Sequence, residues 1–230
     1  MEDFNKTISS ERLWEVMRQR HSVRQYTDEP VSQEQLAELR QLADIYNRTA
    51  DLHIQVIDND PSAFAGRLAS YGKFRNVNNY IAMVGKKGKL LRQNIGFFGE
   101  RIGLCMQNMG LNYCWVGLTF SKKSQRVEVM DDESFVAAIA FGHGANNGYA
   151  HKVKSRADVM EAKDAPQWFL DGVDAALLAP TAVNQQKFKF ILNEDGSVTA
   201  KAGWGFFTQV DLGIAKCHFA FGAGREVTWR

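Results

Sequence analysis

Side chains that could bind an anion are concentrated in a short segment near the start of the chain. Arg20, Ser22 and Arg24 alternate there with His21 and Val23. In an extended backbone, alternate side chains point to the same side, so two guanidiniums and a hydroxyl would face one ligand. Guanidinium groups bind oxyanions through paired, charge-assisted hydrogen bonds, and the segment therefore predicts a phosphate site. The alternative is that the arginines only complement the dipole of a preceding helix.

A second polar segment lies far along the chain, at residues 179–190. Pro180 ends a helix, because proline disfavours helical backbone in the residue before it. Thr181, Asn184 and Gln186 follow, and their hydroxyl and amide groups offer the mixed donors and acceptors that a heterocyclic ring requires. A turn held by Asn184 alone is the structural alternative.

Both segments resemble motifs of the FMN-dependent nitroreductases. Residues 20–31, RHSVRQYTDEPV, are similar to the N-terminal signature of that family, and residues 179–190, APTAVNQQKFKF, are similar to its Ala-Pro-Ser-Ala-x-Asn-x-Gln-Pro-Trp-x-Phe motif. Residues 112–117, NYCWVG, resemble the strand whose backbone passes the flavin ring. Residues 135–142 and 152–156 resemble the late strand and the basic residues that reach the FMN phosphate.

The resemblance implies an α+β, nitroreductase-like fold with a central mixed, largely antiparallel sheet flanked by helices. It also implies FMN as cofactor, NAD(P)H as reductant, and a set of cofactor-binding residues carried over from the motifs. These are Arg20, His21, Ser22, Arg24, Val116, Gly117, Lys154, Arg156, Pro180, Thr181, Asn184 and Gln186. No catalytic side chain is required, because the chemistry takes place at flavin N5.

The motifs also imply a role for each group in this set. Arg20 and Ser22, with Lys154 or Arg156, would hold the phosphate, and Arg24 would lie near the N1 and C2 carbonyl edge. Backbone at residues 116–117 would approach N5. Thr181, Asn184 and Gln186 would line the ring and the ribityl chain. His21 by itself is more typical of a packing residue than of an acid.

One departure from the family pattern predicts an internal duplication. Where the family carries its Asn motif, after the second helix, residues 44–53 read DIYNRTADLH, and the motif appears instead behind a second helix-like run at 166–178. A family homodimer binds each flavin between subunits, so a fused chain could build one site alone. We therefore expect two diverged halves, 1–160 and 161–230, packed either as two domains or as one. The alternative is a coincidental turn and a lost site.

Composition narrows the class of protein. With 230 residues, 45% of them hydrophobic, the chain can bury one sizeable core or two small ones. A net charge of +2 does not favour nucleic acid. The three cysteines are odd in number and lack metal-ligand spacing. The start is acidic and no apolar run reaches the length of a membrane span, so we expect a cytoplasmic protein without membrane partner or metal. A monomer would suffice, and a homodimer stays open.

Hydrophobic periods and caps predict the elements that position these groups. Ser10 is expected to cap the first helix, and Ser32 with Gln35 to form a capping box for the second. Helices are expected at 10–20, 32–46, 90–109, 166–178 and 207–222, and strands at 53–58, 80–84, 113–119, 135–142, 187–193 and 197–203. Residues 222–224, GAG, follow a helix rather than precede one, which excludes a dinucleotide-binding fingerprint.

These features favour an FMN oxidoreductase that passes electrons from NAD(P)H to a nitroaromatic, a quinone or another flat small-molecule acceptor. One alternative is a more specialised reductase or a flavin-modifying enzyme on the same fold. The other is a flavin-binding or degenerate scaffold protein without catalysis.

Overall fold

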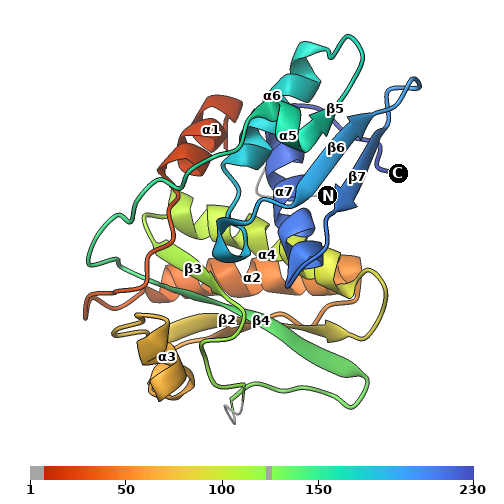
Figure 1. Cartoon of the computed structure of the whole chain (residues 1–230). Coiled ribbons are helices and arrows are strands. Elements are labelled where there is room, and N and C mark those ends of the chain that lie inside the picture. Colours follow the sequence, from red (N-terminus) through yellow and green to blue (C-terminus); the bar gives the residue numbers. More distant parts are fainter. Residues whose placement is uncertain (1–7, 123–125) are drawn as a thin grey trace. The chain divides into compact units, whose positions relative to one another are not determined.

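A computed structural model describes residues 8–122 and 126–230 of the chain (Figure 1). These residues form two compact units, each of which is described here by itself. The four-strand unit contains residues 20–95 and 102–150. The three-strand unit contains the described residues up to Gln19, together with residues 96–101 and 151–230.

The four-strand unit is built on an antiparallel sheet. Its strand order is β1 (Gln55–Ile57), β2 (Asn79–Lys86), β4 (Glu133–Gly142) and β3 (Asn112–Val116). All three strand pairs are antiparallel. The two central strands are almost entirely buried, as their continuous apolar runs predict.

Helices α2 (Gln33–Ala50) and α4 (Leu91–Asn108) lie along one face of this sheet (Figure 1). The predicted capping box of α2 is confirmed, because the Ser32 hydroxyl accepts from the Gln35 backbone N–H and the Gln35 side chain accepts from the Ser32 N–H. The helix runs past the expected end at residue 46. Gly103 lets α4 approach β3, since a Cβ at this position would lie 2.6 Å from the Tyr113 ring.

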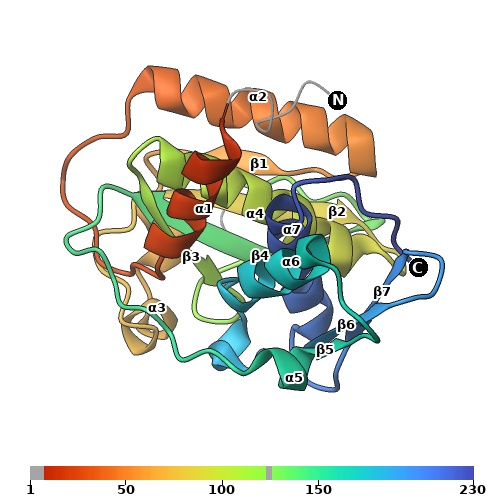
Figure 2. The same ribbon diagram turned by 90° about the horizontal axis from the view of Figure 1, so that it is seen from above.

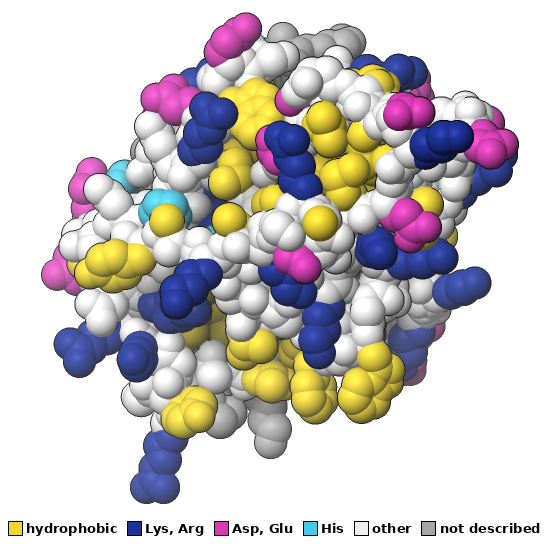
Figure 3. Space-filling model, turned by 45° about the horizontal axis from the view of Figure 1, so that its top comes forward, with side chains coloured by type: hydrophobic (Ala, Val, Ile, Leu, Met, Phe, Trp, Pro, Cys, Tyr) yellow, Lys and Arg dark blue, Asp and Glu magenta, His cyan; other side chains and the backbone are white. Residues whose placement is uncertain are grey.

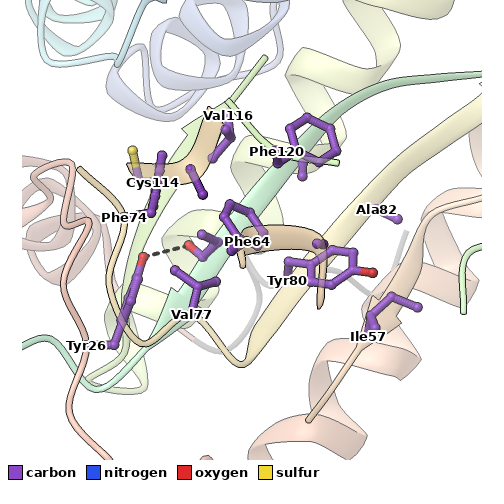
Figure 4. Packing of buried hydrophobic residues seen from close by; sticks show 14 of the residues in the cluster. Tyr26, Ile57, Phe64, Phe74, Val77, Tyr80, Ala82, Cys114, Val116 and Phe120 are labelled. Atoms are coloured by element: carbon purple, nitrogen blue, oxygen red, sulfur yellow. Dashed lines mark hydrogen bonds between the residues drawn. The ribbon is translucent and has the colours of Figure 1, made fainter. Parts of the chain in front are cut away.

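A mainly aromatic and aliphatic cluster covers the opposite face of the sheet (Figure 4). The short helices η2 (Pro61–Phe64) and α3 (Arg67–Tyr71) lie in the segment that covers it. Phe64 packs on Phe74, with ring centroids 5.3 Å apart. Tyr26 closes one end of the cluster, and its hydroxyl donates to the backbone oxygens of Val23 and Ala140. The burial of Val23 and Tyr26 in this cluster holds residues 20–26 against the sheet.

The three-strand unit combines a small sheet with helices. Its strands are β5 (Met160–Glu161), β6 (Phe188–Leu192) and β7 (Val198–Ala202), with β5–β6 parallel and β6–β7 antiparallel. Its helices are α1 (Ser10–Gln19), α5 (Arg156–Val159), α6 (Gln167–Leu177) and α7 (Thr208–Gly222).

Helices α6 and α7 lie side by side (Figure 2). Two glycines permit the close contact near the C-terminal end of α7: a Cβ at Gly172 would meet the Phe219 ring at 2.8 Å, and one at Gly222 would meet Ala175 Cβ at 2.4 Å. Phe190 of β6 packs on Phe219, with ring centroids 4.6 Å apart. Helix α7 is therefore the buried centre of this unit.

A fully buried polar pair also joins residues 96–101 to α7. His218 Nε2 lies 2.7 Å from Glu100 Oε1, and His218 Nδ1 lies 3.1 Å from the Ala175 backbone oxygen. Both side chains are inaccessible to solvent. Since a carbonyl oxygen can only accept, Nδ1 carries a proton and donates to Ala175.

The α+β class with a largely antiparallel sheet and flanking helices is confirmed, with differences in detail. Ser9, not Ser10, caps α1, because its hydroxyl accepts from the Arg12 backbone N–H at 3.2 Å. The strand expected at 113–119 ends at Val116. The elements α5 and β5 were not expected from the sequence. Within the described residues, we find no helix with the length and apolar character needed to cross a membrane.

Candidate functional site

The Arg20, Ser22 and Arg24 segment lies beside strand β3. Ser22 forms a parallel bridge to Tyr113, and the Val23 N–H donates to the Tyr113 backbone oxygen at 3.2 Å. Arg24 contributes its own backbone oxygen, which accepts from Arg75 at 3.0 Å. Backbone hydrogen bonds on both sides therefore fix this segment without using its polar side chains.

The side chains of Arg20, Ser22 and Arg24 all influence the pKa of the buried Cys114 thiol on β3. Burial raises the pKa of this thiol, while the Arg24 charge, a hydrogen bond from Ser22 and the Arg20 charge act in the opposite direction. All three side chains are therefore close enough to Cys114 to influence its thiol, and their convergence on one ligand stays a prediction. Cys114 itself was not predicted as part of the site.

Arg20 has an incomplete set of hydrogen bonds. Its side chain lies over the Tyr113 ring at 5.9 Å, and the residue is only 3% exposed. Its Nε is buried and has no hydrogen-bond partner among the described residues. Buried polar groups are satisfied in most proteins, so an unmatched guanidinium donor points to an absent acceptor. An oxyanion or a ring carbonyl fits this donor, and FMN carries both.

The other predicted residues of this unit are His21, Val116 and Gly117, and their contact with a cofactor stays a prediction. Burial and the neighbouring Arg20 lower the pKa of His21, which favours the neutral imidazole. A Cβ at Gly148, which has φ +67°, would lie 2.7 Å from His21 Cβ, so His21 is held against that turn. Val116 is buried in the aromatic cluster at the end of β3 (Figure 4). Gly117 follows the strand and is half-buried.

Residues 180–186 form a tight turn in the three-strand unit. The turn contains the 3₁₀ helix η3 (Ala182–Asn184). Val183, Asn184 and Gln186 have positive φ angles of 47°, 54° and 44°. For a β-branched residue such as Val183 this conformation is a genuine outlier, and such backbone persists only where surrounding contacts impose it.

Gln186 supplies many of those contacts. It is 3% exposed, and its Nε2 donates to Lys152 O at 2.7 Å and to Asn184 Oδ1 at 2.8 Å. Its Oε1 accepts from the Lys154 N–H at 3.0 Å, and its backbone N–H donates to Thr181 Oγ1 at 3.1 Å. The side chain is therefore committed to holding the turn.

The two basic residues predicted for the phosphate are engaged within the same unit. Lys154 Nζ donates to Gln186 O at 2.9 Å. Arg156 forms a bidentate pair with Asp174, through Nε at 2.6 Å and one terminal nitrogen at 2.5 Å. A phosphate would have to compete with these partners. Of the predicted cations, Arg20 is therefore better suited to bind an anion, because its Nε has no hydrogen-bond partner among the described residues. The assignment of both residues to FMN stays a prediction.

Asp211 is a residue of this region that the sequence analysis missed. It is 2% exposed on α7 and accepts from the Ala182 N–H at 2.9 Å and from Gln185 Nε2 at 2.7 Å. Burial raises its pKa to about 6, and the two hydrogen bonds act to lower it. A lone Asp among the apolar residues 210–215 was the available signal, since such residues are seldom buried without partners.

Exposed aromatic side chains flank the turn. Trp204 is 94% and Phe206 is 85% exposed. Gln185 Nε2 donates to Phe206 O at 2.8 Å, and Lys187 Nζ donates to Trp204 O at 3.1 Å, so the loop 203–207 is tied to the turn. Figure 3 shows one face of the molecule, where exposed apolar groups lie among Lys and Arg side chains.

Among the described residues, no group of three or more His, Cys, Asp or Glu side chains is arranged to hold a metal ion. All three cysteines are buried.

Comparison with known proteins places the chain in a family. A family profile described as "Putative TM nitroreductase" matches residues 12–223. The chain belongs to this nitroreductase family. No curated protein matches the chain.

Solved structures of the family share the fold. A putative nitroreductase from Thermotoga maritima has a TM-score of 0.65 and 20% identity, covering 91% of this chain and 82% of its own. A putative nitroreductase from Desulfovibrio desulfuricans, solved in complex with FMN, has a TM-score of 0.54 and 22% identity, covering 67% and 98%. A nitroreductase family protein from Streptococcus pneumoniae has a TM-score of 0.53 and 12% identity, covering 64% and 98%. The nitroreductase-like fold inferred from the motifs is therefore confirmed.

Proposed function

We propose that this nitroreductase family member is an oxidoreductase that binds FMN and passes electrons from NAD(P)H to a flat, apolar acceptor. The observation that carries the proposal is the buried Arg20 guanidinium with an unmatched Nε, in a segment where Ser22 and Arg24 act on the same buried thiol. Family membership supplies the reaction class, and the relative from D. desulfuricans was solved with FMN. Fold alone would not support an activity.

The four-strand unit would supply the anion-binding part of the site. Arg20 would donate to an acidic oxygen of the cofactor, Ser22 would add a hydroxyl donor, and Arg24 would stabilise negative charge from its exposed position beside Phe74. FMN held by these residues would supply the hydride- and electron-transfer chemistry. The protein's part is to bind, orient and electrostatically favour the reduced cofactor.

We propose further that the turn at residues 180–186 contacts the same FMN molecule, as expected for a fused pair of halves. An antiparallel strand pair with one long helix before it and another after it occurs twice along the chain. The first occurrence is α2, β1, β2 and α4, with η2 and α3 between the strands, and the second is α6, β6, β7 and α7, with η3 before the strands. This repeated order supports the duplication. Among the polar residues of the turn, Asn184 is exposed, and Thr181 and Gln185 are half-buried.

The exposed aromatic loop supports the proposed acceptor class. Trp204 and Phe206 present ring faces to solvent next to the turn, and stacking on such faces favours planar molecules. The proposal of a nicotinamide reductant draws on a neighbour from Bacteroides thetaiotaomicron described as "Putative NADH dehydrogenase/NAD(P)H nitroreductase", with a TM-score of 0.50 and 16% identity.

Spectroscopy of the purified protein tests this function. We expect a yellow protein with flavin absorbance that bleaches anaerobically with NADH or NADPH and recovers on addition of a quinone or nitroaromatic compound. A yellow protein that does not bleach would restrict the function to flavin binding. A colourless protein that cannot be reloaded with FMN would exclude both. Flavin content per chain, measured with the solution mass, would decide between one site per monomer and a site that needs a second copy.

A further inference from the structure

The structure points to Asp211 as the residue that positions the predicted flavin-contact turn, and this inference rests on the proposed function. The turn at 180–186 is strained, since three of its non-glycine residues have positive φ. Its shape must be imposed by contacts from a rigid element. Asp211 lies on α7, whose neighbouring residues 212–215 are all buried, and it is itself buried.

The two carboxylate oxygens of Asp211 hold the turn at two separate places. Oδ1 accepts from the Ala182 N–H, immediately after Thr181, at 2.9 Å. Oδ2 accepts from Gln185 Nε2, immediately after Asn184, at 2.7 Å. Thr181 and Asn184, which were predicted to contact the flavin, are thus each adjacent to a residue that Asp211 fixes.

Gln185 links Asp211 to the loop 203–207, which carries Trp204 and Phe206. Its Nε2 carries two hydrogens, and it donates one bond to Asp211 and one to the backbone oxygen of Phe206 at 2.8 Å. One buried carboxylate therefore organises both the proposed cofactor-facing turn and the proposed acceptor-facing loop. Gln186 fixes the other end of the turn through Lys152 and Lys154, so the two anchors have separate partners.

Variants at Asp211 separate a positioning role from a merely structural one. Asp211→Ala removes both acceptors, and we expect the FMN dissociation constant to rise by about tenfold or more. Asp211→Asn keeps the acceptor for the Ala182 N–H but loses the acceptor for Gln185 Nε2, so we expect an FMN affinity between that of wild type and that of Asp211→Ala. Hydrogen exchange at residues 181–186 and 204–207 of the apoprotein should accelerate in Asp211→Ala and less so in Asp211→Asn.

Asp195→Ala is the matched control. Asp195 also accepts from a turn, through the Ser197 N–H at 3.1 Å and the Ser197 hydroxyl at 2.6 Å, in the hairpin between β6 and β7. Its loss should leave FMN affinity unchanged. If Asp211→Ala does not fold, Gln185→Ala removes one of the two arms and should still weaken FMN binding several-fold.

The outcomes distinguish this inference from the proposed function. If wild type binds FMN and Asp211→Ala, or Gln185→Ala in its place, binds it equally well, the positioning role is wrong and the function stands. If Asp195→Ala weakens FMN binding as much as Asp211→Ala, the effect reflects general stability and the positioning role is again wrong. A wild-type protein that does not bind FMN overturns both.

Discussion

Residues 20–24 and residues 180–186 carry similar polar side chains but are held in opposite ways. The first segment is fixed by backbone hydrogen bonds to Tyr113 and Arg75, which leave a buried Arg20 donor unmatched. The second is fixed by side chains, above all Gln186 and Asp211, whose hydrogen bonds are used to hold a strained backbone. Removing a side chain of the first segment should therefore reduce ligand binding directly. Removing one that holds the second should reduce local stability, with any loss of ligand binding following from the disordered turn.

Arg20→Ala gives the largest expected effect on ligand binding. Loss of a charge-assisted contact to the cofactor should weaken FMN binding by about 10- to 100-fold. The apoprotein should unfold at nearly the same denaturant concentration as wild type, because the lost guanidinium had an unmatched buried donor. Flavin fluorescence titration and urea unfolding measure the two quantities. The exposed Arg48 near the end of α2 provides the control, and Arg48→Ala should change neither.

Gln186→Leu should show the reverse pattern. The substitution leaves the Lys154 N–H without its acceptor, and Lys152 O and Asn184 Oδ1 without the donor they share, so we expect a loss of about 2 to 4 kcal/mol in the free energy of unfolding. Gln167→Leu, which removes an exposed bond to Asp171 on α6, should cost less than about 0.5 kcal/mol. Equal losses in the two variants would contradict the proposed difference between the segments.

Asp211 makes the stability of the turn depend on pH. Burial raises its pKa in the folded protein to about 6, from an ordinary value of 3.8. The folded state therefore binds more protons than the unfolded state between these values, and the stabilising effect of the protonated form is lost as pH rises through 6. Relative to wild type, Asp211→Asn should gain on the order of 2 kcal/mol between pH 4 and pH 7. Urea unfolding across this range checks the prediction, and a difference that does not vary with pH would refute it.

The sequence predicted local features well and long-range partners poorly. The capping box of Ser32 and the buried runs of β2 and β4 depend on neighbouring residues and periodicity, and each was found. The strand β5 has two residues and exists only through its pairing with β6. The convergence of Arg20, Ser22 and Arg24 on one ligand was inferred from their alternation and stays a prediction. The partners of Arg156 and Gln186 depend on distant residues, so no local pattern could show that these side chains are already engaged.

Relief of backbone strain at Val183 gives the smallest and most local test. Its side chain is 96% exposed, so its φ of 47° brings no compensating burial of its own. Asn tolerates this conformation far better than a β-branched residue, and Val183→Asn should stabilise the protein by about 1 kcal/mol. Val153→Asn, at an exposed position without positive φ, should change stability by less than about 0.5 kcal/mol. If Val183→Asn leaves the free energy of unfolding unchanged, the turn is not strained. The contacts of Gln186 and Asp211 would then not be needed to impose its backbone conformation.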